Sequence, residues 1–289
     1  MEHPSSFNNN SDKIYLTTKD YLLTGETFSL VKKGNEGLLE TFPQPKENDL
    51  SKYYDSKEYV SHTDSKKGLI NFFYRIIKKY STHQKVKLIQ KTYKQKGLLL
   101  DIGAGTGDFL FATARNGWNV KGIEVNDRAK KLALKKGIFL IDNFDALKEM
   151  RFDVITLWHV LEHLPNLEEV VIKIENHLKP NGVLIIAVPN YNSFDAAYYK
   201  EFWAAYDVPR HLWHFSKESM KYLFPETIRL IKTKPMIFDA FYVSLLSEKY
   251  KSGTTFSLKA IWVGFLSNLK AWKTKEYSSQ IYIFKKQKA

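Results

Sequence analysis

The chain contains no cysteine among its 289 residues. This absence excludes disulfide bonds and zinc sites built from thiolates. It also excludes any enzyme mechanism in which a cysteine thiolate attacks the substrate. Whatever chemistry the protein performs must therefore use oxygen and nitrogen side chains or a bound cofactor.

Long apolar runs are missing as well. No stretch of about 18 uncharged apolar residues occurs, so the sequence predicts no transmembrane segment. The first 30 residues lack the charged start, apolar centre and small-residue cleavage site that mark a secretory signal. We therefore expect a cytoplasmic protein.

Acidic residues are scarce in two segments of a chain whose net charge is +13. Between Asp64 and Asp101 there is no acidic residue, and ten residues are basic. Residues 249–275 carry six lysines and no acid. Such fields attract phosphates, anionic lipids or acidic glycans, and an ordinary solvated lysine surface is the alternative.

The distribution of polar and apolar residues divides the chain into three parts. Residues 1–50 are polar and rich in turn formers, which predicts a small irregular or β-hairpin appendage. Residues 51–96 are a basic lead-in whose apolar residues recur at helical spacing, with a lid over the main domain as one possible role. Residues 97–289 form the main domain, with a helical insertion at about 236–276.

From residue 97 onward, short apolar runs alternate with amphipathic segments. This rhythm predicts an α/β fold with a Rossmann-like, mostly parallel seven-stranded sheet and helices on both faces. The last two strands are expected to pair at the edge of the sheet. The expected strands are residues 98–102, 119–124, 139–141, 152–158, 183–188, 228–233 and 280–284.

A glycine-rich segment follows the first expected strand. Gly103, Gly105 and Gly107 lie at a strand-to-helix turn, where glycine allows the backbone to turn tightly and approach a ligand. Asp101 precedes them, and Glu124 ends the next strand, where a carboxylate can accept both hydroxyls of a ribose. The spacing differs from the Gly-x-Gly-x-x-Gly fingerprint of dinucleotide-binding folds. The pattern favours a bound cofactor over a tight turn that binds nothing.

The stretch LLLDIGAGTGDF at residues 98–109 resembles motif I of class I S-adenosylmethionine-dependent methyltransferases. Residues 152–164, 178–184 and 188–190 are similar to that superfamily in order and spacing. Residues 207–216 are similar to one broad bacterial subgroup, related to the ubiquinone-biosynthesis O-methyltransferases. The resemblance covers about residues 53–285 and implies S-adenosyl-L-methionine as the cofactor.

The resemblance also implies roles for individual residues. The three glycines would wrap the methionine end of the cofactor, Asp101 would hold its ammonium group, and Glu124 would bind the ribose hydroxyls. The adenine is expected near the end of the third strand. The expected cofactor-binding residues are Asp101, Gly103, Ala104, Gly105, Gly107, Glu124, Val125, Asp142, Asn143, Phe144 and Trp158.

The segment after the fourth strand faces the second substrate in folds of this kind. The related ubiquinone enzymes carry Glu-x-x-Glu-His there, which can hold a divalent metal. This chain has His159 in place of the first glutamate, so we expect no bound metal. His163 is a candidate general base because its unperturbed pKa lies near neutrality. The alternative is that Glu162 and His163 only fix the loop.

Three further basic residues follow the fifth strand in an aromatic neighbourhood, where they should overhang the pocket. Arg210 suits a carboxylate or phosphate, and His211 or His214 can remove a proton. A structural role among the aromatic rings is the alternative. The expected catalytic residues are His163, Arg210, His211 and His214.

The appendage also carries a resemblance. Residues 28–37 resemble the second half of a zinc ribbon that precedes some of these methyltransferases, with Lys33 and Glu36 where cysteines would stand. His3 and Ser6 occupy the places of the first cysteine pair. We expect a remnant of the ribbon without zinc.

Together these features favour methyl transfer to an O, N or C acceptor on a small molecule, glycan or lipid intermediate. An RNA methyltransferase is one alternative, motivated by the positive charge. A scaffold without catalysis is another, although a scaffold would need neither Asp101 nor the glycines. Methylation of pyrimidine C5 is excluded, because it usually requires a cysteine adduct.

Residues 256–272 place large apolar side chains at three- and four-residue steps between lysines, which predicts an amphipathic helix. Such a helix fits the surface of an anionic membrane. Packing on the sheet as the roof of the acceptor pocket is the other interpretation, and the pattern favours it.

Overall fold

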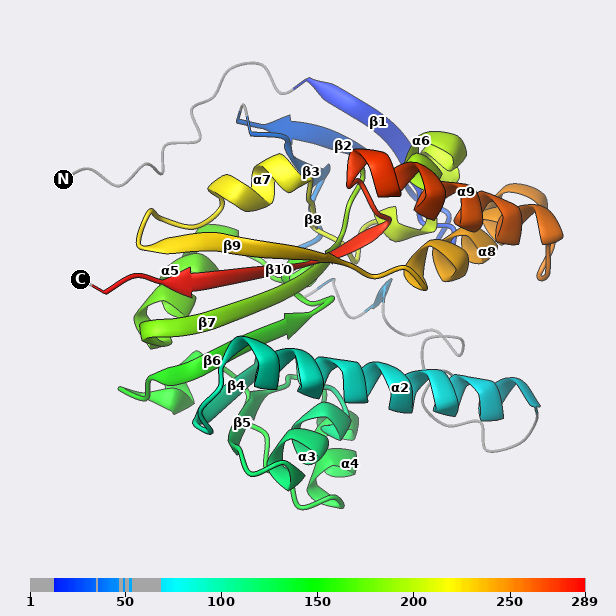
Figure 1. Cartoon of the computed structure of the whole chain (residues 1–289). Helices are drawn as coiled ribbons and strands as arrows, with labels where there is room; N and C mark the ends of the chain where they lie inside the picture. Colours follow the sequence, from blue (N-terminus) through cyan, green and yellow to red (C-terminus); the bar gives the residue numbers. More distant parts are fainter. Residues whose placement is uncertain (1–12, 35, 47–48, 50–51, 54–68, 289) are drawn as a thin grey trace.

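The structure is a computed structural model that describes residues 13–34, 36–46, 49, 52–53 and 69–288, apart from the side chains of residues 69–79. Two β-sheets and the helices around them make up the described part of the chain (Figure 1). The larger sheet and its helices come from residues after 69. The smaller sheet comes mostly from residues before 43.

The larger sheet has six strands in the order β5-β4-β6-β7-β10-β9. The first four of these are parallel, and β10 runs antiparallel to both of its neighbours. The strands are β4 (Leu98–Ile102), β5 (Asn119–Ile123), β6 (Phe152–Trp158), β7 (Leu178–Pro189), β9 (Ile228–Pro235) and β10 (Ser279–Lys286). The α/β prediction is confirmed, and the sheet is mixed. Of the two strands expected at the edge, β10 lies inside the sheet and β9 forms the edge opposite β5.

The seventh strand expected at residues 139–141 is reduced to a single bridge. Ile141 pairs with Ile123, donating its N–H to Gly122 O and accepting from Glu124 N. Phe139 is exposed. A segment this short makes too few ladder bonds and buries too little surface to continue the sheet beyond β5.

The helices largely follow the expected pattern. The lead-in, expected as one or two helices, contains one long helix, and the insertion is a helical hairpin of two helices. The longer helices are α2 (Leu69–Thr92), α5 (Leu167–His177), α8 (Asp239–Ser252) and α9 (Leu258–Thr274). The last two of these form the inserted hairpin. Shorter helices are α3 (Asp108–Arg115), α4 (Asp127–Leu134), α6 (Phe194–Tyr199) and α7 (Lys217–Tyr222). No helix in the described ranges is long and apolar enough to cross a membrane.

Alternate residues of the central strands enter two apolar clusters. Val154 and Ile185 pack with side chains of α2 and α3. Their neighbours Ile155 and Ile186 pack with side chains of α5 and α7. Because successive side chains of a strand point to opposite sides, these clusters lie on opposite faces of the sheet. All four residues are fully buried, and each contributes about 1.5–3 kcal/mol of hydrophobic stabilisation.

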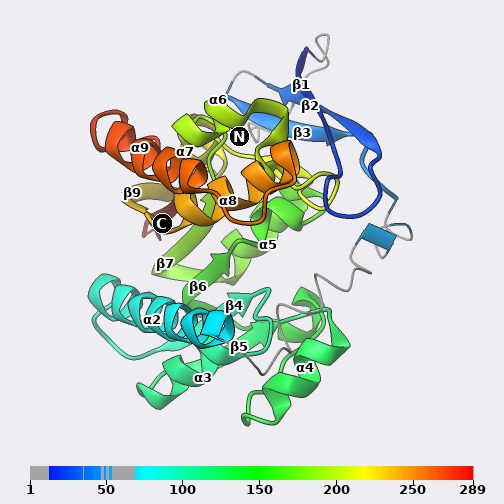
Figure 2. The same cartoon turned by 90° about the vertical axis from the view of Figure 1, so that its right-hand side faces the viewer.

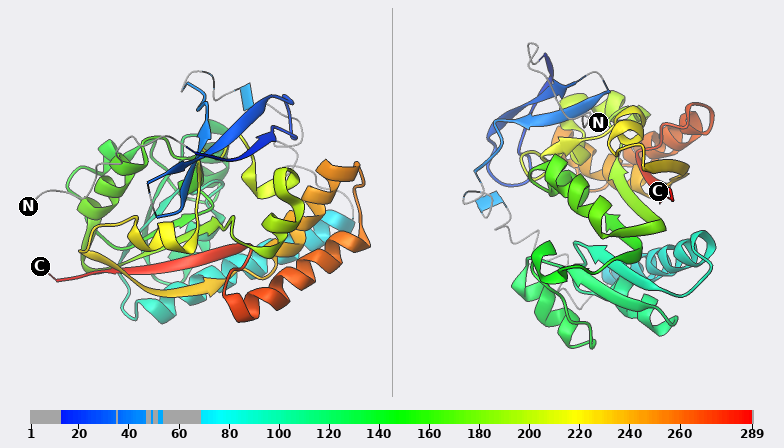
Figure 3. Two further views of the ribbon diagram at one scale, coloured as in Figure 1. Left: turned by 90° about the horizontal axis from the view of Figure 1, so that it is seen from above. Right: turned by 90° about the vertical axis from the view of Figure 1, so that its left-hand side faces the viewer.

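The appendage is a small antiparallel sheet that borrows a strand from the main domain. Its order is β1-β2-β3-β8, with β1 (Ile14–Lys19), β2 (Thr27–Lys33), β3 (Leu38–Phe42) and β8 (Trp213–His214). The sheet lies at the opposite end of the molecule from α3 and α4 (Figures 1 and 3). Because β3 pairs with β8, the appendage is joined by backbone hydrogen bonds to the segment 207–214 of the main domain.

A buried ion pair fastens the turn after β1 to the loop before β8. The Arg210 guanidinium is 1% exposed and lies 2.8 Å from Asp20 Oδ1 and 2.7 Å from Asp207 Oδ1. Arg210 also donates to the carbonyl oxygen of Tyr53 at 3.1 Å. Asp20 in turn caps the turn after β1 by accepting the backbone N–H of Leu22 at 3.1 Å. Although burial alone would raise the pKa of Asp20, its bond to Arg210 and those within the turn hold that pKa below its usual value.

We expect Arg210→Met to lower the free energy of unfolding by about 3–5 kcal/mol, because Asp20 is left as an unpaired buried charge. Urea unfolding followed by circular dichroism measures this loss. The matched control is Lys173→Met, which removes an exposed ion pair with Glu169 and should cost about 1 kcal/mol or less. A loss for Arg210→Met no larger than that of the control would contradict the anchoring role.

Candidate functional site

The three glycines of the loop after β4 all have positive φ, but their surroundings differ. A Cβ on Gly103 would lie 2.4 Å from Val160, and one on Gly107 would lie 2.9 Å from Ala133. A Cβ on Gly105 would meet no atom within 4 Å among the described residues. Gly103 and Gly107 are therefore needed for packing, whereas Gly105 borders open space at the carboxyl edge of the sheet.

Glu124 lies directly beside this open space. Its Oε2 accepts the backbone N–H of Gly105 at 2.7 Å, and its Oε1 accepts that of Asn126 at 2.9 Å. Ala104 donates its N–H to Ile123 O at 2.9 Å and so ties the same loop to β5. A carboxylate has about four lone-pair directions, so Glu124 keeps acceptor capacity for a ligand.

Asp101 is buried in β4, just before the glycines in the chain. Thr156 donates its hydroxyl to Asp101 Oδ1 at 2.6 Å. Burial raises the pKa of Asp101 to about 7, against the opposing effects of the Thr156 bond and the positive charge of Lys85. A buried carboxylate with so high a pKa gains most from a cation that binds next to it.

Lys85 is a site residue that the sequence did not single out. It projects from α2, and its Nζ lies 4.5 Å from the ring centre of Trp158 at the end of β6. The ring of Phe109 meets Trp158 edge-on at 5.7 Å. No sequence signal separates Lys85 from the other basic residues between Asp64 and Asp101, since its position depends on how α2 crosses the sheet.

The residues expected around an adenine fall into two groups, exposed residues and one residue that packs against the core. Val125 is exposed, and Asp142 forms an exposed ion pair with Lys130. Asn143 accepts the N–H of Asp145 at 3.0 Å and begins the short 3-10 helix η2 (Phe144–Leu147). The ring of Phe144, however, stacks on His177 at 5.7 Å and packs against the core. Phe144 is therefore turned away from solvent, and the adenine prediction depends on the first three residues.

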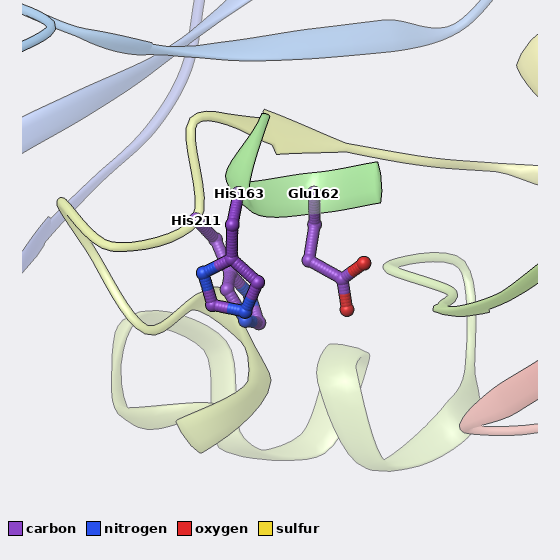
Figure 4. A group of neighbouring side chains, drawn as sticks. All are labelled: Glu162, His163 and His211. Carbon is purple, nitrogen blue, oxygen red and sulfur yellow. The ribbon is translucent and has the colours of Figure 1, made fainter. Parts of the chain in front are cut away.

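A second group of polar side chains lies beyond the end of β6. Glu162 and His163 come from the 3-10 helix η3 (Leu161–His163), and His211 comes from the loop before β8 (Figure 4). Each offers one ligand atom, and these atoms all lie within 4.8 Å of one another. Because Gly103 packs against Val160, this cluster shares the carboxyl edge of the sheet with the glycine loop.

Backbone carbonyls orient both imidazole rings. Nδ1 of His163 lies 3.0 Å from Arg210 O, and Nδ1 of His211 lies 2.9 Å from Ala205 O. A carbonyl oxygen can only accept a hydrogen bond, so Nδ1 must carry the hydrogen in each neutral ring. Nε2 then carries the lone pair. Burial and the nearby His211 lower the pKa of His163 to about 4, so His163 is neutral at neutral pH.

Glu162 is almost fully buried, and neither of its carboxylate oxygens has a hydrogen-bond partner among the described residues. Its closest ionic neighbour is His159, whose Nδ1 lies 3.4 Å from Glu162 Oε1 and whose Nε2 lies 3.2 Å from Asp239 Oδ2. Burial opposes the charge of His159, but its two carboxylate neighbours raise its pKa to about 10. His159 is thus an ionic link between η3 and the first turn of α8.

Two of the expected catalytic residues serve the fold in the structure. His214 is buried, its Nε2 lies 2.9 Å from Thr41 Oγ1, and burial holds its pKa well below the usual value. Arg210 faces Asp20 and Asp207, and its guanidinium is not part of the cluster. The structure therefore groups His163 with His211. The side chains of Arg210 and His214 instead contact residues of the appendage.

Three comparisons bear on this site. The residues 74–227 match the family model described as "Methyltransferase domain". A ubiquinone biosynthesis O-methyltransferase from Rickettsia canadensis is 30% identical over 100 residues, which cover 32% of this chain and 42% of the relative. Another from Actinobacillus pleuropneumoniae is 33% identical over 106 residues, covering 32% and 45%. The chain thus spans less than half the length of these curated relatives.

Solved structures agree on the fold. A magnesium protoporphyrin IX methyltransferase from Synechocystis with bound S-adenosylhomocysteine superposes with a TM-score of 0.53 and 13% identity, over 84% of this chain and 100% of that one. The match to the family model covers residues 74–227, which are more than half of the chain. The chain belongs to the family of proteins with this methyltransferase domain.

Proposed function

We propose that the protein is an S-adenosylmethionine-dependent methyltransferase that acts on a small molecule. The observation that carries the proposal is the open space in front of Gly105, beside the carboxylate of Glu124 and after the strand that carries the buried Asp101. A tight turn without a ligand needs neither a buried carboxylate of raised pKa nor a glycine that faces open space. A cofactor with a cationic end and a ribose uses both.

Each residue of this edge has a role in binding the cofactor. Asp101 pairs with the methionine ammonium, and Lys85, whose charge acts on Asp101, attracts the methionine carboxylate. Glu124 accepts hydrogen bonds from the ribose hydroxyls while its bond to Gly105 holds the loop. The adenine lies over Val125 toward Asp142 and Asn143.

The reaction needs alignment more than it needs a covalent intermediate. A lone pair on the acceptor atom attacks the methyl carbon in line with the carbon–sulfur bond. That bond breaks, its electron pair returns to sulfur, and S-adenosylhomocysteine leaves while the acceptor gives up its proton. Holding the two reactants in line is worth up to about 7–11 kcal/mol of barrier.

The relatives favour an oxygen acceptor on a small molecule. The two curated relatives are named as O-methyltransferases of ubiquinone biosynthesis, and the Synechocystis enzyme is named for a porphyrin. A glycan, a lipid intermediate or a nucleic acid are alternative acceptors. A substrate affinity that falls steeply as the salt concentration rises would favour RNA as the acceptor.

The cluster of Glu162, His163 and His211 fits a divalent cation. It combines a carboxylate without hydrogen-bond partners among the described residues with two imidazole nitrogens whose lone pairs are fixed by carbonyls on the opposite ring nitrogen. A cation held there would lower the pKa of an acceptor hydroxyl. The sequence expectation of no metal rested on His159 alone, whereas this set uses His211 as its third member.

Gly105→Ala is expected to weaken binding of S-adenosylmethionine at least about tenfold, because its methyl group enters the space of the cofactor. Isothermal titration calorimetry measures the change. The matched control is Gly253→Ala between α8 and α9, since Gly253 also has a positive φ and an added methyl group there would meet no described atom within 4 Å. Equal affinities of the two variants for S-adenosylmethionine would contradict the placement of the cofactor at Gly105.

Affinity for the cofactor should fall as the pH drops through about 7, the raised pKa of Asp101. Below that pH the unliganded carboxyl is protonated, so binding the ammonium must first expel a proton. We expect affinity to be about tenfold weaker at pH 6 than at pH 8. Asp101→Asn should bind the cofactor weakly at both pH values. An affinity of the wild type that does not change with pH would contradict the pairing of Asp101 with the ammonium group.

The wild type should bind one equivalent of Mn²⁺ or Zn²⁺ in calorimetric titration, and His211→Gln should bind at least about tenfold more weakly through loss of one ligand. His177→Gln is the matched control, because His177 also places Nδ1 2.8 Å from a carbonyl oxygen but lies on α5. If the wild type binds no cation, or His211→Gln binds it as tightly, the expectation of no metal at this site holds.

A further inference from the structure

Helix α9 presents its large apolar side chains to solvent. Five of them recur at steps of four and three residues and so form one stripe along the helix. Their exposed fractions lie between 46% and 75%. The members of this apolar stripe are Leu258, Trp262, Phe265, Leu269 and Trp272. A stripe of this size on the surface of a monomer is unusual and marks a contact site.

The opposite side of α9 does the packing, and it is built from small residues. The buried members are Ala260, Val263, Gly264, Ser267 and Ala271. A Cβ on Gly264 would lie 2.9 Å from the Cα of Phe241 in α8, so the two helices approach closely. The roof expected from the sequence would bury the large side chains, and the structure buries the small ones.

The place of α9 leaves the apolar stripe accessible. The helix runs along the outside of the molecule beside α8, far from α3 and α4 (Figures 1 and 2). Trp262 and Phe265 stack on each other at 5.4 Å on this outer side. Phe256, in the turn that leads into α9, is exposed as well. A helix of 17 residues is about 26 Å long, so the stripe is long enough to rest on a flat surface.

Lysines lie beside the apolar stripe. Residues 249–275 contain six lysines and no acidic residue, and the buried Glu248 of α8 is paired with one of them, Lys259, at 3.1 Å. Lys259, Lys270 and Lys273 are exposed and, at 100° per residue, lie along one edge of the stripe. Their long side chains can extend past the aromatic rings toward anionic groups. The combination of Trp, Phe and Leu with lysines at one edge is typical of a helix that lies in a lipid interface.

We infer that the apolar stripe of α9 docks on an anionic lipid surface. A second copy of the chain is a poorer occupant, because antiparallel packing of two stripes would bring the two sets of lysines to the same edge. A neutral surface would offer no anionic groups to Lys270 and Lys273. The inference rests on α9 alone and stands whether or not the methyl acceptor is a lipid.

Co-sedimentation with vesicles tests the inference. The full chain should bind vesicles that contain phosphatidylglycerol in low salt, and binding to pure phosphatidylcholine vesicles should be at least about tenfold weaker. Trp262→Ser/Phe265→Ser should lose at least about tenfold in binding to the anionic vesicles. Binding that is equal on both lipids, or absent from both, would overturn the anionic surface.

Two controls separate docking from a change in the fold. Ile172→Ser/Tyr222→Ser removes two exposed apolar side chains from α5 and α7 and should bind anionic vesicles like the wild type. Lys270→Gln/Lys273→Gln leaves the apolar stripe intact and should lose the preference for phosphatidylglycerol, which keeps the inference testable if the first variant is unstable. Retention of that preference would overturn it.

The oligomeric state distinguishes the competing occupant. Sedimentation velocity without lipid should give the same mass for the wild type and Trp262→Ser/Phe265→Ser. A wild-type dimer that the double substitution converts to a monomer would assign the stripe to a second copy of the chain and overturn the lipid surface.

Discussion

The buried pairing of Arg210 with Asp20 supports both the small sheet and the histidine cluster. Asp20 follows β1 and Arg210 lies in the loop before β8, and the side chain of Arg210 is surrounded by protein groups that accept its hydrogen bonds. Its own carbonyl then accepts from Nδ1 of His163, and the carbonyl of His211 accepts from Thr41 at 2.6 Å. Removing a charge at this point would leave its partner uncompensated and release the loop that carries His211. The arginine thus positions the cluster from behind.

The two halves of the proposed site meet because the parallel strands end at one edge. Asp101 lies near the end of β4 and the glycine loop follows that strand, whereas the segment from His159 to His163 follows β6, its neighbour in the sheet. The contact of Gly103 with Val160 sets how closely these loops approach. Cofactor and acceptor would therefore be held by adjacent strand ends, which is where open α/β sheets bind ligands.

Helix α9 shows how composition and packing can disagree. Its pattern of large apolar residues is that of a helix with one buried face, yet its small residues form the contact with α8 and α6. The close approach at Gly264 explains the choice, since small side chains allow two helices to pack with little space between them. The large side chains remain outside with the lysines, where their chemistry suits a lipid interface.

Much of the fold and half of the site could be predicted from the sequence. β6 begins and ends where the apolar run predicts, and the pairing of β9 with β10 follows from two short apolar segments. The third strand failed as a prediction because residues 139–141 have an apolar composition but too few partners to make a ladder. The zinc-ribbon remnant stays a prediction, because His3 and Ser6 lie outside the described residues. Lys33, which stands in one of the cysteine positions, forms an ion pair with Glu40.

The sequence by itself determined the features that depend on neighbours in the chain: the strand-turn-helix rhythm, the glycine turn with Asp101, and the place of Glu124 one strand later. These follow from local sterics and from the period of apolar residues. Tertiary structure alone decided that His211 joins Glu162 and His163, that the charge of Lys85 acts on Asp101, and that Arg210 turns away from the site. Those outcomes depend on residues far apart in the chain, and only the packing of helices and loops on the sheet fixes the distances between them.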